Sequence, residues 1–190
     1  MASASSIGID PGANGRVELR SLAGAAEGWP ANHDGEGVML DAFREALSAV
    51  PMPVTVVTAI EAGRAHGTPV GAFCSLSAKP PLVLLALDRD SNLLPFVEST
   101  GRFAVNVLAN DQEEIGRTCA RKDVKKFTTV AWYERGGLPR IEGAAAWLAC
   151  HVRDLLPGGD HVIVVGLVTE CELGVSGALV YHRRRYLELA

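Results

Sequence analysis

The pattern of apolar and polar positions along the chain is dominated by short β-type runs. Segments rich in Val, Ile and Leu recur from residue 54 onward, as β-strands require. Turn signals separate them, chiefly residues 61–67 with Gly63 and Gly67, and the sequence Pro157-Gly158-Gly159-Asp160. The expected strands are 54–59, 70–75, 82–87, 103–108, 127–133, 146–155 and 161–173, with a final strand or hairpin at 179–187. Many short strands with few helices predict a mainly β domain built as a closed antiparallel barrel.

Helical spacing of apolar residues is confined to short segments. It predicts a helix over 41–50, which Pro51 ends. Ser91 can cap a second short helix over 91–99. A third begins at 111–117, with acidic residues in its first turn, where the helix dipole favours them.

Length and charge limit the class of protein further. The 190 residues suffice for one well-packed domain, and a net charge of −4 disfavours a nucleic-acid surface. Residues 1–38 are rich in Ala, Gly and Ser without periodicity, which predicts a flexible N-terminal extension before a domain at 39–190. No apolar run is long enough to span a bilayer, and no signal-peptide pattern opens the chain, so we expect a cytoplasmic protein.

Four cysteines are present, and none forms a C-x-x-C pair. We interpret them as buried, reduced thiols, because Cys150 and Cys171 fall in apolar strand-like runs. Cys150, His151 and His161 lack the close ligand spacing of a zinc site, so we predict no metal.

Residues 67–92 carry the strongest candidate chemistry. Small and hydroxyl residues precede an apolar strand, and Arg89 and Ser91 follow its end. Backbone amides, a hydroxyl and a guanidinium together can bind the phosphate of a flat cofactor. The alternative is that Arg89 pairs with Asp88 or Asp90 and that Ser91 merely caps a helix.

Several motifs follow one another in order along residues 39–190. They include Ser75, Ser77, Pro80-Pro81-Leu82-Val83, Leu87-Asp88-Arg89-x-Ser91, Gly101-Arg102-Phe103-Ala104-Val105-Asn106-Val107-Leu108, Asp111-Gln112, Gly158-Gly159-Asp160-His161 and the tail from Tyr181 to Tyr186. In this order they resemble the short-chain NAD(P)H:flavin oxidoreductases, which have the FMN-binding split β-barrel fold, an antiparallel Greek-key arrangement. The resemblance therefore implies a flavin reductase-like domain.

The resemblance also implies which residues hold the flavin. Those expected to bind the ring, the ribityl chain and the phosphate are Gly71, Ala72, Phe73, Cys74, Ser75, Asp88, Arg89, Ser91, Lys126 and Phe127. Gly71 and Ala72 stand where the family usually has Asn and Ser, which keeps backbone contacts and removes side-chain ones. Lys126 also lies in a basic run whose ordinary interpretation is a solvated surface.

His161 is the expected catalytic residue. The resemblance implies that it faces the nicotinamide, where it hydrogen-bonds the carboxamide or stabilises negative charge on the flavin. It also implies that Arg183 and Tyr186 border the nicotinamide pocket. The alternatives are a strand-edge histidine bonded to a carbonyl and a tyrosine buried in the core.

The expected activity is reduction of FMN or FAD by hydride transfer from NADH or NADPH. The resemblance implies a homodimer that binds flavin between subunits and a separate flavin-dependent oxygenase that receives the reduced flavin. No G-x-G-x-x-G follows a strand, so no Rossmann domain is expected. Two alternatives stay open: an enzyme that retains its flavin and acts on an organic substrate, and a non-catalytic module that binds flavin or haem. The sequence does not choose between FMN and FAD, or between NADH and NADPH.

Overall fold

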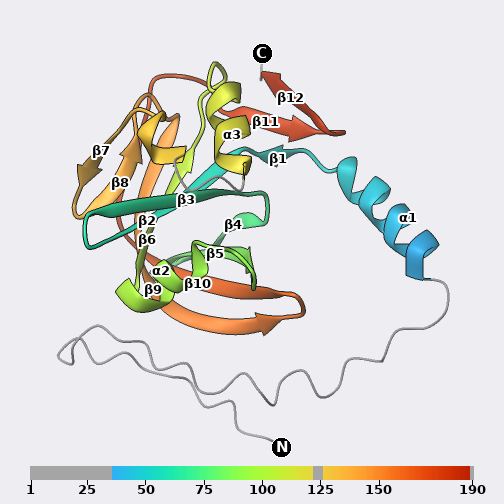
Figure 1. The fold of residues 1–190 in the computed structure, drawn as a ribbon, viewed down its shortest axis with the longest axis horizontal. Helices are drawn as coiled ribbons and strands as arrows, with labels where there is room; N and C mark the ends of the chain where they lie inside the picture. The colour runs from blue at the N-terminus through green and yellow to red at the C-terminus, as the bar shows by residue number, and fades with distance from the viewer. Residues whose placement is uncertain (1–35, 122–125, 189–190) are drawn as a thin grey trace, which may run out of the picture.

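The computed structural model describes residues 36–121 and 126–188 (Figure 1). The helices are α1 (Glu36–Ser48), α2 (Leu94–Thr100), α3 (Glu113–Ala120) and the short 3-10 helix η2 (Lys126–Thr128). The strands are β1 (Met52–Pro53), β2 (Thr55–Glu61), β3 (Arg64–Val70), β4 (Phe73–Ala78), β5 (Pro81–Asp88), β6 (Arg102–Val107), β7 (Trp132–Arg135), β8 (Leu138–Ile141), β9 (Ala146–Gly158), β10 (His161–Leu173), β11 (Leu179–His182) and β12 (Arg185–Glu188). Within these ranges, no helix has the length and apolar character needed to cross a membrane.

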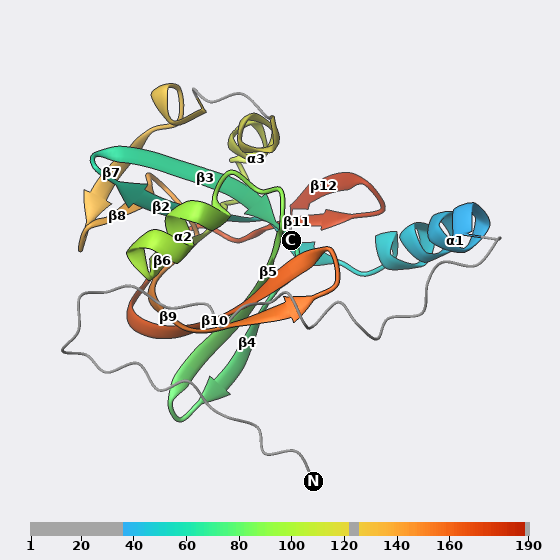
Figure 2. The same cartoon turned by 60° about the horizontal axis from the view of Figure 1, so that its bottom comes forward.

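A seven-stranded antiparallel sheet forms the body, in the order β3-β2-β6-β9-β10-β5-β4. Two smaller sheets, β1-β11-β12 and β7-β8, flank it (Figure 2). The mainly β, antiparallel prediction is confirmed. The prediction of a closed barrel is wrong, because the two edge strands of this sheet, β3 and β4, do not pair with each other. They are the edge strands although they follow each other in the sequence.

The strand expected over 70–75 is wrong at its start, because the chain breaks there between β3 and β4. Val70 ends β3, and β4 begins only at Phe73. Gly71 and Ala72 form the turn between them, in which the Phe73 N–H donates to the Gly71 carbonyl at 2.9 Å. The run of small residues therefore lets the chain leave one edge and start the other.

The hairpin expected over 61–67 is present but tighter. Its turn is Ala62-Gly63, both with positive φ, and Gly67 lies inside β3. A Cβ at position 67 would lie 2.7 Å from the Phe127 ring, so glycine is required there for close packing and not for turning.

The expected strand over 127–133 is also wrong in detail. Its first part is the helix η2, and the strand proper, β7, begins at Trp132. Gly136 and Gly137, both with positive φ, turn β7 back into β8. This hairpin was not among the predicted elements, because β8 is short and contains Pro139.

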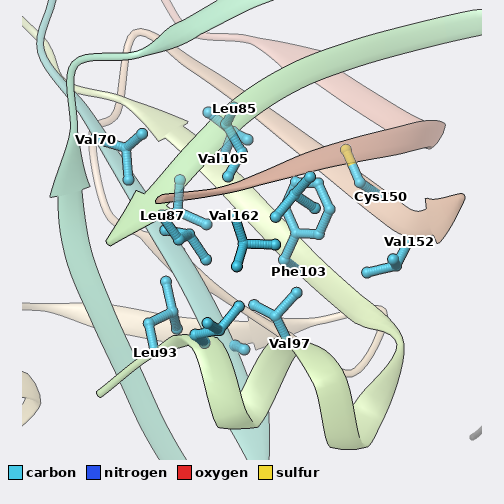
Figure 3. Close-up of a cluster of buried hydrophobic side chains, with 14 of the residues drawn as sticks. Val70, Leu85, Leu87, Leu93, Val97, Phe103, Val105, Cys150, Val152 and Val162 are labelled. Atoms are coloured by element: carbon cyan, nitrogen blue, oxygen red, sulfur yellow. The ribbon is translucent and has the colours of Figure 1, made fainter. Parts of the chain in front are cut away.

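The main core lies between the large sheet and α2 (Figure 3). Val97 points from α2 toward the ring of Phe103, and Leu93 points toward Leu87; all four side chains are buried. Gly166 on β10 leaves the room that this ring needs, since a Cβ there would overlap the Phe103 ring. A second core contains Val54 and Leu108, against which Tyr181 and Tyr186 pack.

Asn106 joins three strands with its buried side chain. Its Nδ2 donates to the Val56 carbonyl at 3.2 Å and to Thr58 Oγ1 at 3.1 Å. Its Oδ1 accepts the Ile141 N–H at 2.8 Å. Because every polar group of this amide is satisfied, it fixes β8 on β2 and β6 without leaving an unpaired buried group.

Helix α1 extends away from the body in both views (Figures 1 and 2). It confirms a helix in the region expected at 41–50, but its bounds are Glu36–Ser48, so it both begins and ends earlier than expected. The Arg183 N–H donates to the Ser48 carbonyl at 2.7 Å, which ties the end of the helix to the β11–β12 hairpin. Apart from residues 36–38, the expected N-terminal extension lies outside the described residues.

Gly166→Ala tests the packing of the main core. We expect a loss of about 1–3 kcal/mol in the free energy of unfolding, measured by chemical denaturation, because the new methyl group must displace the Phe103 ring. Gly177→Ala is the matched control, since a Cβ at position 177 meets nothing within 4 Å. Equal stability of the two variants would contradict this account of the core.

Candidate functional site

A cavity of about 250 Å³ opens where β3 ends. Its walls come from β1, β2, the end of β3, the end of α3 and the β11–β12 hairpin, and are mostly apolar. They are formed by Met52, Pro53, Val54, Thr55, Pro69, Val70, Gly71, Ala120, Tyr181 and Tyr186. The cavity thus brings together Gly71, expected to contact flavin, and Tyr186, expected beside nicotinamide.

Gly71 lies against the side chain of Met52 in the cavity wall. A Cβ at position 71 would lie 3.3 Å from Met52 Sδ, which is a tight contact that the flexible methionine side chain would have to relieve. Gly71, one of the two positions at which the family usually has a larger polar residue, lies in the cavity wall, whereas Ala72 does not.

Strand β4 offers backbone groups for a planar ligand. It pairs with β5 on one side and has no strand partner on the other side within the described chain. Ala72 is exposed and accepts the Ala86 N–H at 3.0 Å, while Phe73 packs on the main core. Cys74 and Ser75 are exposed on the edge strand. An edge of this kind presents the donors and acceptors that the polar rim of a flavin ring requires.

Arg89 is held at the corner where β5 meets β10. Its backbone N–H donates to the Asp160 carbonyl at 3.0 Å, and its Nε donates to the Gly159 carbonyl at 2.8 Å. The side chain forms no ion pair with Asp88 or Asp90, which was the alternative explanation for it. The terminal guanidinium nitrogens therefore remain available for a phosphate.

The neighbours of Arg89 shape the loop that carries it. Asp88 Oδ1 accepts the Asp90 N–H at 2.7 Å, and Ser91 Oγ accepts the Leu93 N–H at 3.3 Å. Both contacts are local turns of the kind that short polar side chains form. Asp88 and Ser91 are thus placed beside Arg89 and have structural partners of their own.

His161 lies opposite Asp88 in the β5–β10 pairing, so the expected catalytic residue and the expected phosphate residues share one corner. Its Nδ1 is 2.7 Å from Asp160 Oδ1, and its side chain is 40% exposed. The partner is thus a carboxylate and not the carbonyl of the alternative interpretation. The hydrogen bond and charge of His161 hold the pKa of Asp160 below its usual range.

Asp160, which stands within the Gly-Gly-Asp-His motif, contacts the His161 ring directly, and the sequence alone does not predict this contact. An ionised carboxylate only accepts hydrogen bonds, so this contact favours the neutral tautomer that carries its proton on Nδ1. That leaves Nε2 of His161 for a ligand.

The β11–β12 hairpin carries Arg183 and Tyr186. The rings of Tyr181 and Tyr186 meet edge to face with centroids 5.1 Å apart, and the Arg117 guanidinium lies 5.0 Å from the Tyr186 ring centroid. Burial raises the pKa of Tyr186, which keeps its hydroxyl protonated. Tyr186 is thus both a core contact and a cavity wall, whereas Arg183 is exposed at the turn.

The structure places Lys126 and Phe127 against the middle of β3. Lys126 is buried, and its Nζ donates to the Cys119 carbonyl at 2.6 Å. Phe127 packs on Gly67 and meets Trp132 edge to face. These contacts give both residues a structural role, and neither lines the cavity at Gly71.

The cysteines divide into two groups. Cys119 and Cys150 are buried as expected, and burial raises their pKa values to about 11 and about 12. Cys74 and Cys171 are exposed, contrary to the prediction, because each lies on the outer side of its strand. Over the described ranges, no group of three His, Cys, Asp or Glu residues is arranged to hold a metal ion.

The Asp160–His161 contact predicts one tautomer. We expect nitrogen NMR of the neutral imidazole to place the proton on Nδ1 in the wild type, and Asp160→Asn to shift it toward Nε2. His161→Ala identifies the signals by their loss. An unchanged tautomer in Asp160→Asn would show that the carboxylate does not orient the ring.

The chain is similar to known proteins in both sequence and structure. Residues 47–190 match the model of the flavin reductase like domain. The reductase component of 4-hydroxyphenylacetate 3-monooxygenase from Thermus thermophilus is 43% identical over 152 residues, which cover 80% of this chain and 97% of that protein. A flavin reductase of Pseudomonas putida is 38% identical over 147 residues, which cover 76% of this chain and 86% of that protein.

A further relative is longer. A probable flavin reductase of Rhizobium meliloti is 40% identical over 147 residues, and the match spans 47% of its length. Among solved structures, the NADH:FAD oxidoreductase of Streptomyces globisporus, solved with NAD and FAD fragments, superposes with a TM-score of 0.77 at 30% identity. The superposition covers 85% of this chain and 98% of that one. The chain belongs to the flavin reductase-like family of NAD(P)H:flavin oxidoreductases, whose members include the reductase components of two-component monooxygenases.

Proposed function

We propose that this protein binds FMN or FAD in the cavity beside Gly71, reduces it with NADH or NADPH, and releases it to a separate flavin-dependent oxygenase. One observation carries the proposal: a single cavity joins Gly71, beside the unpaired edge strand, to Tyr186 on the β11–β12 hairpin. Its apolar walls suit a flat ring system, and the β4 edge suits the polar rim of that ring.

The bound flavin supplies the hydride-accepting chemistry. The chain's own residues bind and orient the flavin and the hydride donor, and they exclude water. The backbone from Gly71 to Ser75 is proposed to hold the ring, and the Arg89 guanidinium to hold the phosphate with Asp88 and Ser91 shaping its loop. The apolar walls keep solvent away from the reacting faces.

His161 is proposed to act on the reacting groups through Nε2. Asp160 holds the proton on Nδ1 and fixes the ring plane, so Nε2 accepts a hydrogen bond from the carboxamide when neutral. When the imidazole is protonated, Nε2 would donate a hydrogen bond to negative charge on the flavin ring. Tyr186, which lines the cavity, and Arg183, which is exposed at the turn of the same hairpin, are proposed to border the nicotinamide.

Anaerobic mixing of protein, excess FMN or FAD, and NADH or NADPH tests the activity. We expect repeated turnover, seen as loss of the flavin absorbance far beyond the protein concentration. Bleaching of a stoichiometric bound fraction alone would favour an enzyme that retains its flavin. Absence of bleaching with every pair of cofactors would leave a flavin-binding or haem-binding module and would overturn the proposal.

His161→Ala tests the catalytic role. We expect the stopped-flow rate of hydride transfer to fall by roughly 10²-fold, because a preorganised group facing the reacting atoms is lost. His151→Ala is the matched control, since His151 is an exposed histidine on the neighbouring strand β9. A rate that is unchanged in His161→Ala would remove His161 from the mechanism.

We also propose that the protein works as a homodimer in the cytoplasm. Met39, Phe43 and Leu47 recur along α1 and are 72%, 55% and 49% exposed, which is an unfavourable arrangement for an isolated chain. A second copy seated on this face would lie next to the hairpin that lines the cavity. The cysteines are free thiols, the state that a reducing compartment maintains.

Light scattering after gel filtration tests the dimer. We expect the mass of two chains for the wild type and for Arg44→Ala, and the mass of one chain for Phe43→Glu, because a charge in the buried face of a dimer is strongly unfavourable. A wild-type protein that elutes as a single chain, or a Phe43→Glu variant that stays dimeric, would contradict the proposed interface.

A further inference from the structure

A second hollow, of about 370 Å³, adjoins the first. It is lined by Arg117, Arg121, Arg184, Ala120, Tyr181 and Tyr186. Ala120 and the two tyrosines also line the cavity at Gly71, so the two hollows share a wall. None of the described residues that line this second hollow is acidic. The site therefore has an apolar compartment and a basic compartment side by side.

The three arginines come from two different elements. Arg117 and Arg121 lie on α3 and at its end, and Arg184 lies at the tip of the β11–β12 hairpin. Their convergence depends on the packing of Tyr186 against Arg117 and Gly116. The basic compartment is thus built by tertiary structure and is not a run of neighbouring charges.

The hairpin tip presents its arginines in an unusual conformation. Arg183 and Arg184 have φ values of 48° and 61°, both in the left-handed region. Two-residue turns of this kind favour Asn-Gly, because residues with larger side chains are strained there. This turn places Arg184 at the edge of the basic hollow in spite of the unfavourable backbone conformation.

Each guanidinium that lines the hollow already has one carboxylate partner. The pairs are Arg117–Glu113 at 2.5 Å, Arg121–Glu114 at 3.9 Å and Arg184–Glu45 at 3.4 Å. All of these side chains are well exposed, and such pairs contribute little. An arginine has five N–H donors, so each keeps donors for a second anion.

The two compartments together define the ligand. The apolar one accepts a flat ring, and the basic one accepts at least one phosphate linked to that ring, with the tyrosine rings between them. The Arg89 corner is already proposed for the phosphate of FMN, so the basic hollow suits a further phosphate group. A dinucleotide has this second, phosphate-bearing end.

The geometry points to the basic hollow of Arg117, Arg121 and Arg184 as the binding subsite for the adenosine diphosphate half of a dinucleotide. This inference rests on the proposed function, because it takes the adjoining cavity as the place of flavin and nicotinamide. FAD, NADH and NADPH all carry the adenosine diphosphate group, and FMN lacks it. The subsite therefore binds the half of the ligand that does not react.

Calorimetric titration with ADP alone tests the subsite without any turnover. We expect ADP to bind the wild type and to bind Arg121→Ala and Arg184→Gly about tenfold more weakly, because each variant loses charge-assisted hydrogen bonds. Arg184→Gly also relieves the positive φ, so a weakened fold cannot explain its loss of affinity. Arg185→Ala is the matched control, since Arg185 is exposed on the same hairpin and does not line the hollow.

Steady-state kinetics identify which dinucleotide uses the subsite. If FAD does, the variants raise the KM for FAD and leave that for FMN unchanged. If NADH or NADPH does, the KM for the hydride donor rises with either flavin. ADP that fails to bind the wild type, or binds all variants equally, would overturn the subsite while flavin reduction continued. A protein that reduces no flavin would instead overturn the proposed function.

Discussion

The divergence of β3 and β4 is the constraint on which the rest of the structure depends. Two strands that are joined by only Gly71 and Ala72 end at opposite edges of one seven-stranded sheet. A closed barrel would pair these edges and satisfy their backbone groups, whereas this fold leaves an edge at the place where the cavity opens. An unpaired edge is a liability in a folded protein unless something else binds it, and a flat, polar-rimmed ligand can do so.

Two separate cores keep the cavity in shape. The main core holds Val70 and Phe73 on either side of the break, under α2. The second core holds Val54 and carries Tyr186 from the C-terminal hairpin. Because the cavity lies between two packed clusters, its walls are set by the fold and do not depend on the ligand. Asn106 and Gly166 contribute from a distance, by fixing β8 on the sheet and by making room for Phe103.

Much of this architecture was readable from the sequence. The long β9–β10 hairpin followed from its Pro-Gly-Gly-Asp turn, and the β-branched runs gave the strands of the large sheet. Strand pairing across the sheet was not readable, because the route from β3 to β4 depends on long-range partners and not on local propensity. The hairpin β7–β8 was missed for a related reason: it is short, and its Gly136-Gly137 turn follows a run that also resembles one longer strand.

The candidate site, too, could be predicted from the sequence only in part. Arg89 and His161 were selected from motifs far apart in the sequence, and the β5–β10 pairing brings them to one corner. Asp160 carried a signal, since it precedes His161 directly, yet its contact with Nδ1 depends on the turn geometry. The basic hollow gave no sequence signal, because Arg117 and Arg184 approach each other only through the packing of Tyr186.

Hydrogen exchange of the backbone amides tests most directly whether the open edge beside Gly71 is the flavin site. Exchange is measured by mass spectrometry with and without saturating FMN. We expect slower exchange over 71–75 and at 89–91 when FMN is bound, with exchange in β7 and β8 unchanged. Protection confined to another surface, with 71–75 exchanging at the same rate in both samples, would contradict it.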